Sequence, residues 1–219
     1  MNEFLQDLPL FFQSIGQTLV IVLVSLVVSG ALGLAIGIAL WATRPGNLLE
    51  NRVVFTIVNV IVNIVRPVPF IIFAAAIAPL TVAVLGSYIG LQGAAFAISL
   101  GASFAVARVV EQNLVAVDPG VIEAARAMGA GPLRIIFTVL IPEGLGPLTL
   151  GYTFIYVGLV DLSAQAGTIG GGGLGDFAIT YGLGRYNYTI IYITVAVIIV
   201  IVQVGQFVGN WLARKALRR

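Results

Sequence analysis

The sequence predicts an all-α membrane protein with five transmembrane helices and one short cytoplasmic helix. Hydrophobic residues make up 59% of the 219 residues and charged residues only 9%, and the mean hydropathy is +1.08. A soluble domain carries about 25% charged residues, so most of this chain requires a lipid environment. Five apolar runs are long enough to cross a bilayer core, which needs about 20 helical residues. They are residues 15–42, 53–79, 88–107, 144–167 and 187–213.

The first run follows residues 1–14, which we expect to form an external N-terminal segment. Within the run, Gly33 and Gly37 have the G-x-x-x-G spacing of closely packed helices. We expect the membrane domain to occupy residues 15–213 and a basic cytoplasmic tail to occupy residues 214–219.

The second and third runs require a turn near Gly86-Ser87, because residues 67–107 carry no charge that would separate them. The fourth and fifth runs are separated by the glycine-rich residues 167–175. Glycine disfavours helix by about 1 kcal/mol relative to alanine, so we expect an external loop there.

The basic residues select one orientation by the positive-inside rule. Nine of the eleven would lie on one side of the membrane, and only Arg185 on the other. This distribution predicts an external N-terminus and a cytoplasmic C-terminus. Because membrane topology accounts for the clustered basic residues, we expect no nucleic-acid partner. The nine residues are Arg44, Arg52, Arg108, Arg126, Arg134, Arg214, Lys215, Arg218 and Arg219.

A short polar helix is predicted between the third and fourth runs, at about residues 118–130. Asp118 is a suitable N-cap and Pro119 a suitable first helical residue. Gly129 would end the helix. We expect Val121, Ala125 and Met128 to form its apolar stripe.

Composition excludes several functional classes. The chain has no His and no Cys, so zinc sites with these ligands, iron–sulfur clusters and Ser–His enzymes are excluded. An aspartyl membrane protease needs two Asp residues at membrane depth, and only Asp161 qualifies. The single Lys215 follows no glycine-rich phosphate loop. We therefore expect no enzyme activity, metal or cofactor on this chain, and any ATP hydrolysis on another.

Two charged residues fall inside apolar runs, where a charge needs a partner or water. Arg66 precedes Pro67 and Pro69, which favour a broken helix whose free carbonyls line a cavity. It is a candidate gate or pathway residue, or else a structural residue capping those carbonyls. Asp161 is a candidate pathway residue that could pair with Arg66, or else lies at the outer interface.

The segment from Glu123 to Pro142 resembles the coupling motif of type-I ABC importer permeases. Its pattern is E-A-A, three residues, Gly, nine residues, an aliphatic residue, one residue, and an aliphatic residue before Pro, with Glu123-Ala124-Ala125, Gly129, Val139 and Ile141-Pro142 in register. The chain is most similar to permeases of methionine importers. The supporting segments are residues 43–46, 63–70, 107–113, 170–176, Tyr181-Gly182 and Arg185-Tyr186.

This resemblance implies a symmetric homodimer in the bacterial cytoplasmic membrane. It also implies two ATPase subunits that carry ATP and Mg and bind at Glu123, Ala124, Ala125 and Gly129, and an external solute-binding protein. Methionine is the leading substrate.

The chain departs from the family pattern at Asp161 and Gln165 in the fourth run, so a more polar amino acid remains an alternative substrate. A secondary transporter is a further alternative. Five spans are few for one, however, and it would not need a docked cytoplasmic helix.

Overall fold

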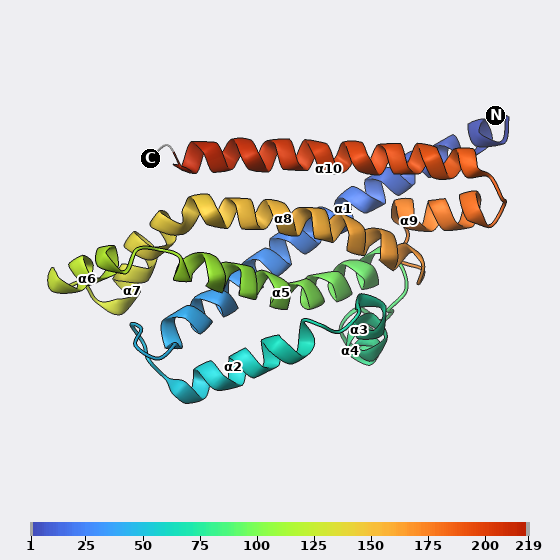
Figure 1. The fold of residues 1–219 in the computed structure, drawn as a ribbon. Helices are drawn as coiled ribbons and strands as arrows, with labels where there is room; N and C mark the ends of the chain where they lie inside the picture. Colours follow the sequence, from blue (N-terminus) through green and yellow to red (C-terminus); the bar gives the residue numbers. More distant parts are fainter. Residues whose placement is uncertain (1, 218–219) are drawn as a thin grey trace.

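The computed structural model describes residues 2–217, with side chains from residue 7 onward, and the elements in this range are helices (Figure 1). Two of them, η1 and η2, are π-helices. In chain order the elements are α1 (Asn2–Thr43), α2 (Arg52–Val65), α3 (Phe70–Ala76), α4 (Ala78–Leu85), α5 (Leu91–Val115), α6 (Pro119–Ala127), α7 (Pro132–Ile135), η1 (Ile136–Leu140), α8 (Ile141–Gly167), α9 (Gly173–Phe177), η2 (Ala178–Leu183) and α10 (Tyr188–Leu217).

Four helical segments are long and apolar enough to cross a membrane. They are Asp7–Thr43, Leu91–Val115, Pro132–Gly167 and Tyr188–Leu217. The bent pair α2 and α3 supplies a fifth if it is counted as one span. The predicted all-helical class is therefore confirmed, with four candidate spans among the described residues, or the predicted five when the bent pair is one span.

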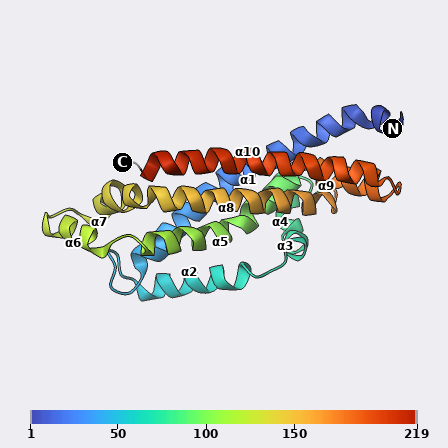
Figure 2. The ribbon, with the colours of Figure 1, turned by 45° about the horizontal axis from the view of Figure 1, so that its top comes forward.

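The predicted run 53–79 is not one straight helix. Helices α2 and α3 meet at an angle of 113°, with the break at residues 66–69 (Figure 2). Pro67 and Pro69 have no N–H to donate to the preceding turn, so neither can continue the hydrogen bonds of α2. The broken helix predicted at Arg66 is thus present.

Helices α1 and α5 pack closely through Gly33 and Gly37. A Cβ at Gly33 would lie 2.9 Å from the carbonyl oxygen of Ser103, and one at Gly37 would lie 2.7 Å from that of Ala107. Only glycine permits this approach, so the packing predicted from the spacing is confirmed.

Three segments have helix boundaries that the sequence did not indicate. Helix α1 is continuous from Asn2, so the described residues of the segment expected outside the membrane belong to the same helix as the first span. A short helix, α9, begins at Gly173 inside the glycine-rich stretch expected to be a loop. At the C-terminus α10 continues to Leu217, while Arg218 and Arg219 lie outside the described residues.

The molecule is elongated and its two ends differ. One end carries α6, α7, the loop between α1 and α2, and the C-terminal end of α10 (Figure 1). The other carries α9, η2 and the N-terminal end of α1. The predicted short helix therefore lies at the opposite end from the turn between η2 and α10.

Candidate functional site

The short helix α6 begins as the sequence predicts. Asp118 is its N-cap, and the Oδ1 atom accepts a hydrogen bond of 2.8 Å from the N–H of Gly120. Pro119 is the first helical residue, where its missing N–H costs nothing. The start is thus fixed by two adjacent residues.

The end of α6 is a Schellman motif. The N–H of Ala130 donates to the carbonyl of Ala125 over 3.1 Å, and the N–H of Gly129 to that of Arg126 over 2.9 Å. This pairing requires a left-handed residue at the position of Gly129, which has φ 79°. Gly129 is therefore needed by the backbone itself, which is the physical reason for a glycine in the motif.

The buried face of α6 differs from the predicted stripe. Ile122 and Ala125 are buried, in one hydrophobic cluster with residues Ile135 and Ile136 of α7 and η1. Met128, expected on that face, is 82% exposed. Helix α6 packs on α7 and η1, which follow it in the chain. Its buried face is therefore centred on Ile122 and Ala125, and not on the stripe that periodicity alone predicts.

The predicted coupling residues consequently divide into two groups. Ala125 is buried and holds α6 to the protein, whereas Glu123, Ala124 and Gly129 are exposed. Together with Met128 they form a surface at the end of the molecule that this chain leaves uncovered. Such a surface can receive another protein.

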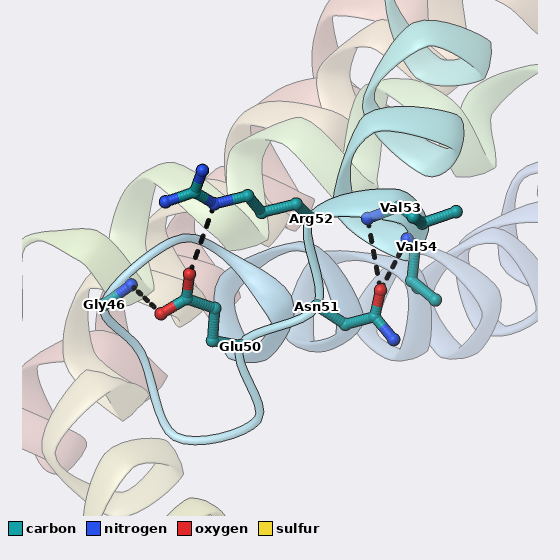
Figure 3. Close-up of polar contacts among 6 residues, drawn as sticks. All are labelled: Gly46, Glu50, Asn51, Arg52, Val53 and Val54. Carbon is teal, nitrogen blue, oxygen red and sulfur yellow. Dashed lines mark hydrogen bonds and ion pairs between the residues drawn. The ribbon is translucent and has the colours of Figure 1, made fainter.

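The loop between α1 and α2 borders the exposed surface of α6. Several hydrogen bonds and an ion pair hold this loop in place (Figure 3). Glu50 accepts from the N–H of Gly46 over 3.1 Å and pairs with Nε of Arg52 at 3.4 Å. Asn51 caps α2, its Oδ1 accepting from the N–H groups of Val53 and Val54, each over 3.1 Å. The loop and α6 enclose a hollow of about 260 Å³ between them, lined in part by Arg44, Asn47, Glu123 and Arg126.

A π-helix joins this region to the fourth span. Residues Ile136–Leu140 form η1, and the N–H of Ile141 donates to the carbonyl of Ile136. Pro142 follows at the start of α8 and cannot donate to residue 138, which favours a wider turn before it. The exposed Pro142 of the motif thus marks the junction between the short helices and the span.

A second candidate site is a cavity of about 270 Å³ at the break between α2 and α3. Its walls come from α2, α3, α5 and α8 and are mostly apolar. Arg66 contributes the only charged side chain of the lining. The cavity can therefore accept a mainly apolar molecule that carries one negative group. The lining includes Phe70, Phe73, Phe154, Gly158 and Leu162.

Asp161 does not pair with Arg66. Its Oδ2 accepts a hydrogen bond of 2.9 Å from Nε2 of Gln165, one turn further along α8. Among the described residues, none of the ion pairs within 4.0 Å involves Arg66. Both charges are exposed in the single chain. Asp161 and Gln165, which were expected to depart from the family pattern, therefore interact with each other.

Sequence reasoning missed a polar network that ties α2 to α5. Nη2 of Arg108 donates to Oδ1 of Asn59 over 2.8 Å and to Oδ1 of Asn63 over 2.7 Å. Its Nη1 pairs with the buried Glu111. Breaking a buried pair typically costs about 3–5 kcal/mol, because one charge is left unpaired. The sequence does carry one signal of this network: Arg108 and Glu111 have opposite charges, lie three residues apart and directly follow the uncharged residues 67–107.

Comparison with known proteins identifies the family. Residues 31–219 match the family described as binding-protein-dependent transport system inner membrane component. A probable D-methionine transport system permease protein of Vibrio cholerae is 44% identical over 203 residues, covering 93% of this chain and 90% of the relative. The D-methionine transport system permease protein of Escherichia coli K12 is 39% identical over 158 residues, which cover 72% of this chain and 73% of the relative.

The fold is also that of a solved transporter subunit. A chain of the MetNI methionine ABC transporter, solved in inward-facing conformations, superposes with a TM-score of 0.94 at 36% identity. The superposition covers 96% of this chain and 98% of that one. The resemblance to ABC importer permeases is confirmed, and the alternative of a secondary transporter is set aside. The chain belongs to the family of inner membrane components of binding-protein-dependent transport systems.

Proposed function

We propose that this chain is the permease subunit of an ATP-driven importer for methionine. The observation that carries the proposal is the 44% identity, over nearly the full length of both chains, to a probable D-methionine permease. The superposition on a methionine transporter subunit supports the same substrate. The chain itself supplies the membrane path and no chemistry.

The partners follow from the two ends of the molecule. Two copies of the chain would form a symmetric dimer around one path. An ATPase subunit, with its ATP and Mg, would bind each exposed surface of Glu123, Ala124, Met128 and Gly129. An external binding protein would deliver the substrate at the opposite end. ATP drives transport only if these partners bind the two access states with different affinity.

The orientation is part of the proposal. Arg126 and Arg134 lie on or next to α6, and Arg214 and Lys215 lie in the last turn of α10 at the same end of the molecule. Arg185 lies at the other end. By the positive-inside rule the α6 end is cytoplasmic, and the N-terminal end of α1 is external.

The cavity at Arg66 is the proposed part of the path. Methionine has an apolar side chain and a carboxylate, which match the apolar walls and the single guanidinium of this cavity. A carboxylate and a guanidinium form strong charge-assisted hydrogen bonds. Substitution Arg66→Gln should therefore raise the KM for uptake at least about tenfold, which corresponds to roughly 1.4 kcal/mol. The matched control is Arg52→Gln, an exposed arginine outside the cavity.

The Asp161–Gln165 pair favours the second candidate, import of a more polar amino acid. Uptake by proteoliposomes that contain the permease, its ATPase and its binding protein separates the two. Labelled L-methionine, D-methionine and glutamine would be compared. Accumulation of methionine supports the proposal, whereas accumulation of glutamine alone assigns the polar substrate.

Coupling is tested in the same proteoliposomes. Glu123→Ala should abolish the stimulation of ATP hydrolysis by the loaded binding protein, because it changes the surface offered to the ATPase. Glu143→Ala, an exposed glutamate at the start of α8, is the control and should retain stimulation. If Glu123→Ala behaves as wild type, α6 is not the coupling surface.

A further inference from the structure

Residues 184–187, between η2 and α10, form a turn that we call the distal turn. It lies at the end of the molecule opposite α6 (Figure 1). The N–H of Asn187 donates to the carbonyl of Gly182 over 2.8 Å, and the N–H of Tyr186 to that of Leu183 over 3.1 Å. This is again a Schellman pair, and the residue at its left-handed position is Tyr186, with φ 53°.

A tyrosine at this position is unexpected on backbone grounds. The chain ends α6 and α8 with the same hydrogen-bond pair, and there the left-handed residues are Gly129 and Gly170. In the part of the chain that the structure describes, Tyr186 is the one non-glycine residue with positive φ. Its side chain is 81% exposed, so packing within the chain does not account for it. The exposed ring is therefore available for a contact outside the chain.

The distal turn is held firmly on both sides. The guanidinium of Arg185 pairs with Asp7 of α1 at 3.0 Å and lies 4.6 Å above the ring centroid of Tyr181. That ring stacks at 4.9 Å on the buried Phe177. On the other side, Oδ1 of Asn187 accepts from the N–H of Ile190 over 3.4 Å. The backbone at Tyr186 is thus fixed before any partner arrives.

A rigidly presented tyrosine has the properties of an interface anchor. Tyrosine is enriched among the residues that dominate binding energy, and a fixed geometry avoids the entropy of ordering on binding. Leu183 and Tyr188 are also exposed and flank it in the sequence, which extends the apolar contact. A tyrosine that only anchors a protein in the lipid interface needs no left-handed backbone, and an exposed tyrosine such as Tyr192 lies in the regular helix α10.

We propose that the distal turn is a docking anchor for the external solute-binding protein, with Tyr186 inserted into a pocket of that protein. The inference rests on the proposed function, which puts this end outside the cell. It also rests on the family, whose transport systems depend on a binding protein. The ion pair of Arg185 and Asp7 forms a polar rim beside the ring.

The test compares four proteins, each assembled with the ATPase subunit in nanodiscs: wild type, Tyr186→Gly, Tyr186→Phe and Tyr192→Ala. Glycine suits the left-handed backbone, so Tyr186→Gly removes the side chain without straining the turn. Tyr192 is the matched control, since it is 71% exposed and lies in a regular helix. The Kd of the cognate binding protein is measured by interferometry, with basal ATP hydrolysis and dimer mass as further readouts.

We expect Tyr186→Gly to raise the Kd by about tenfold or more, and the other two variants to change it by less than about twofold. Basal hydrolysis and dimer mass should be unchanged. An unchanged Kd in Tyr186→Gly overturns the proposal. Loss of the dimer would assign the turn to a contact between copies, and loss of basal hydrolysis would trace the effect to the fold. Wild type that binds no binding protein would instead refute the proposed function, and this inference with it.

Discussion

The two ends of the membrane domain terminate a helix with the same pair of hydrogen bonds but place different residues at its left-handed position. At the α6 end this residue is Gly129, with φ 79°, and in the distal turn it is Tyr186, with φ 53°. A residue with a Cβ pays roughly 1–2 kcal/mol for this conformation. The α6 end avoids that strain, and the distal end accepts it.

The difference indicates what each end contributes. At α6 the proposed partner surface is the exposed face of the helix. The residue in the left-handed position, Gly129, has only to terminate the helix. In the distal turn the strained residue is itself the exposed side chain. The strain can be relieved by a single substitution, and the 81% exposed ring offsets little of it by packing within the chain.

The largest effect should come from moving strain to the α6 end. Gly129→Val introduces a β-branched residue at positive φ, where it is a severe outlier. We expect the end of α6 to rearrange and methionine uptake into proteoliposomes to fall about tenfold or more, while the membrane helices stay folded. Gly131→Val is the control, because Gly131 has φ −70° and free space around its Cβ position. Equal uptake by both variants would contradict the role of the left-handed ending.

The third Schellman motif gives an intermediate effect. Gly170→Ala places a Cβ at φ 83°, 3.3 Å from Cγ2 of Ile89. We expect a loss of about 1–2 kcal/mol and a fall in Tm of several degrees in detergent, measured by size exclusion after heating. Gly16→Ala, in the open face of α1, should be neutral or stabilising. A Tm for Gly170→Ala at or above that of wild type would exclude strain as the reason for glycine here.

Relieving the strain in the distal turn should have the opposite sign. Asparagine tolerates the left-handed region, so Tyr186→Asn should raise the Tm by about 2–4 °C, the shift expected for roughly 1 kcal/mol. Tyr186→Ala removes the same ring but keeps the strain, and its Tm should stay close to that of wild type. The comparison in Tm between these two variants separates the ring from the backbone. A lower Tm for Tyr186→Asn than for Tyr186→Ala would show that the turn is unstrained.

The smallest effect concerns the ion pairs at the two ends. Asp7 is mostly buried and pairs with the half-exposed Arg185 at 3.0 Å, whereas Glu50 pairs with a largely exposed Arg52 at 3.4 Å. Asp7→Asn should lower stability by up to about 1 kcal/mol, and Glu50→Gln by less. Both effects should shrink at 1 M salt, where charges are screened within about 3 Å. Thermal unfolding at low and high salt measures them, and a salt-independent loss in Asp7→Asn would point to packing instead.

The spans and the start of α6 could be predicted because local chemistry decides them. Apolar runs longer than 20 residues have few alternatives, and Asp118 followed by Pro119 fixes a helix start in any context. The break at Pro67 and Pro69 belongs to the same class. The angle of 113° at this break could not be predicted. Proline determines where a helix ends, but packing against neighbouring helices determines the direction of the next one.

The rest of the site depends on contacts between distant segments. Periodicity placed Met128 on the buried face of α6, but packing on Ile135 and Ile136 turned that face toward Ile122. The opposite charges of Arg108 and Glu111 are a local signal of the polar network, but no local pattern signals that Arg108 also binds Asn59, 49 positions away. Tyr186 was visible in the sequence only as part of a resemblance, because its backbone conformation is set by hydrogen bonds across the turn.

The length of α1 bears on the membrane itself. Its 42 residues extend about 63 Å at roughly 1.5 Å per residue, twice the ~30 Å of a hydrocarbon core. The 25 residues of the enclosed α5 extend only about 38 Å. Because α1 exposes apolar side chains along much of its length, a thicker or thinner bilayer still meets apolar surface there. Hydrophobic mismatch is thereby absorbed at the periphery, and transport should depend little on the acyl-chain length of the host lipids.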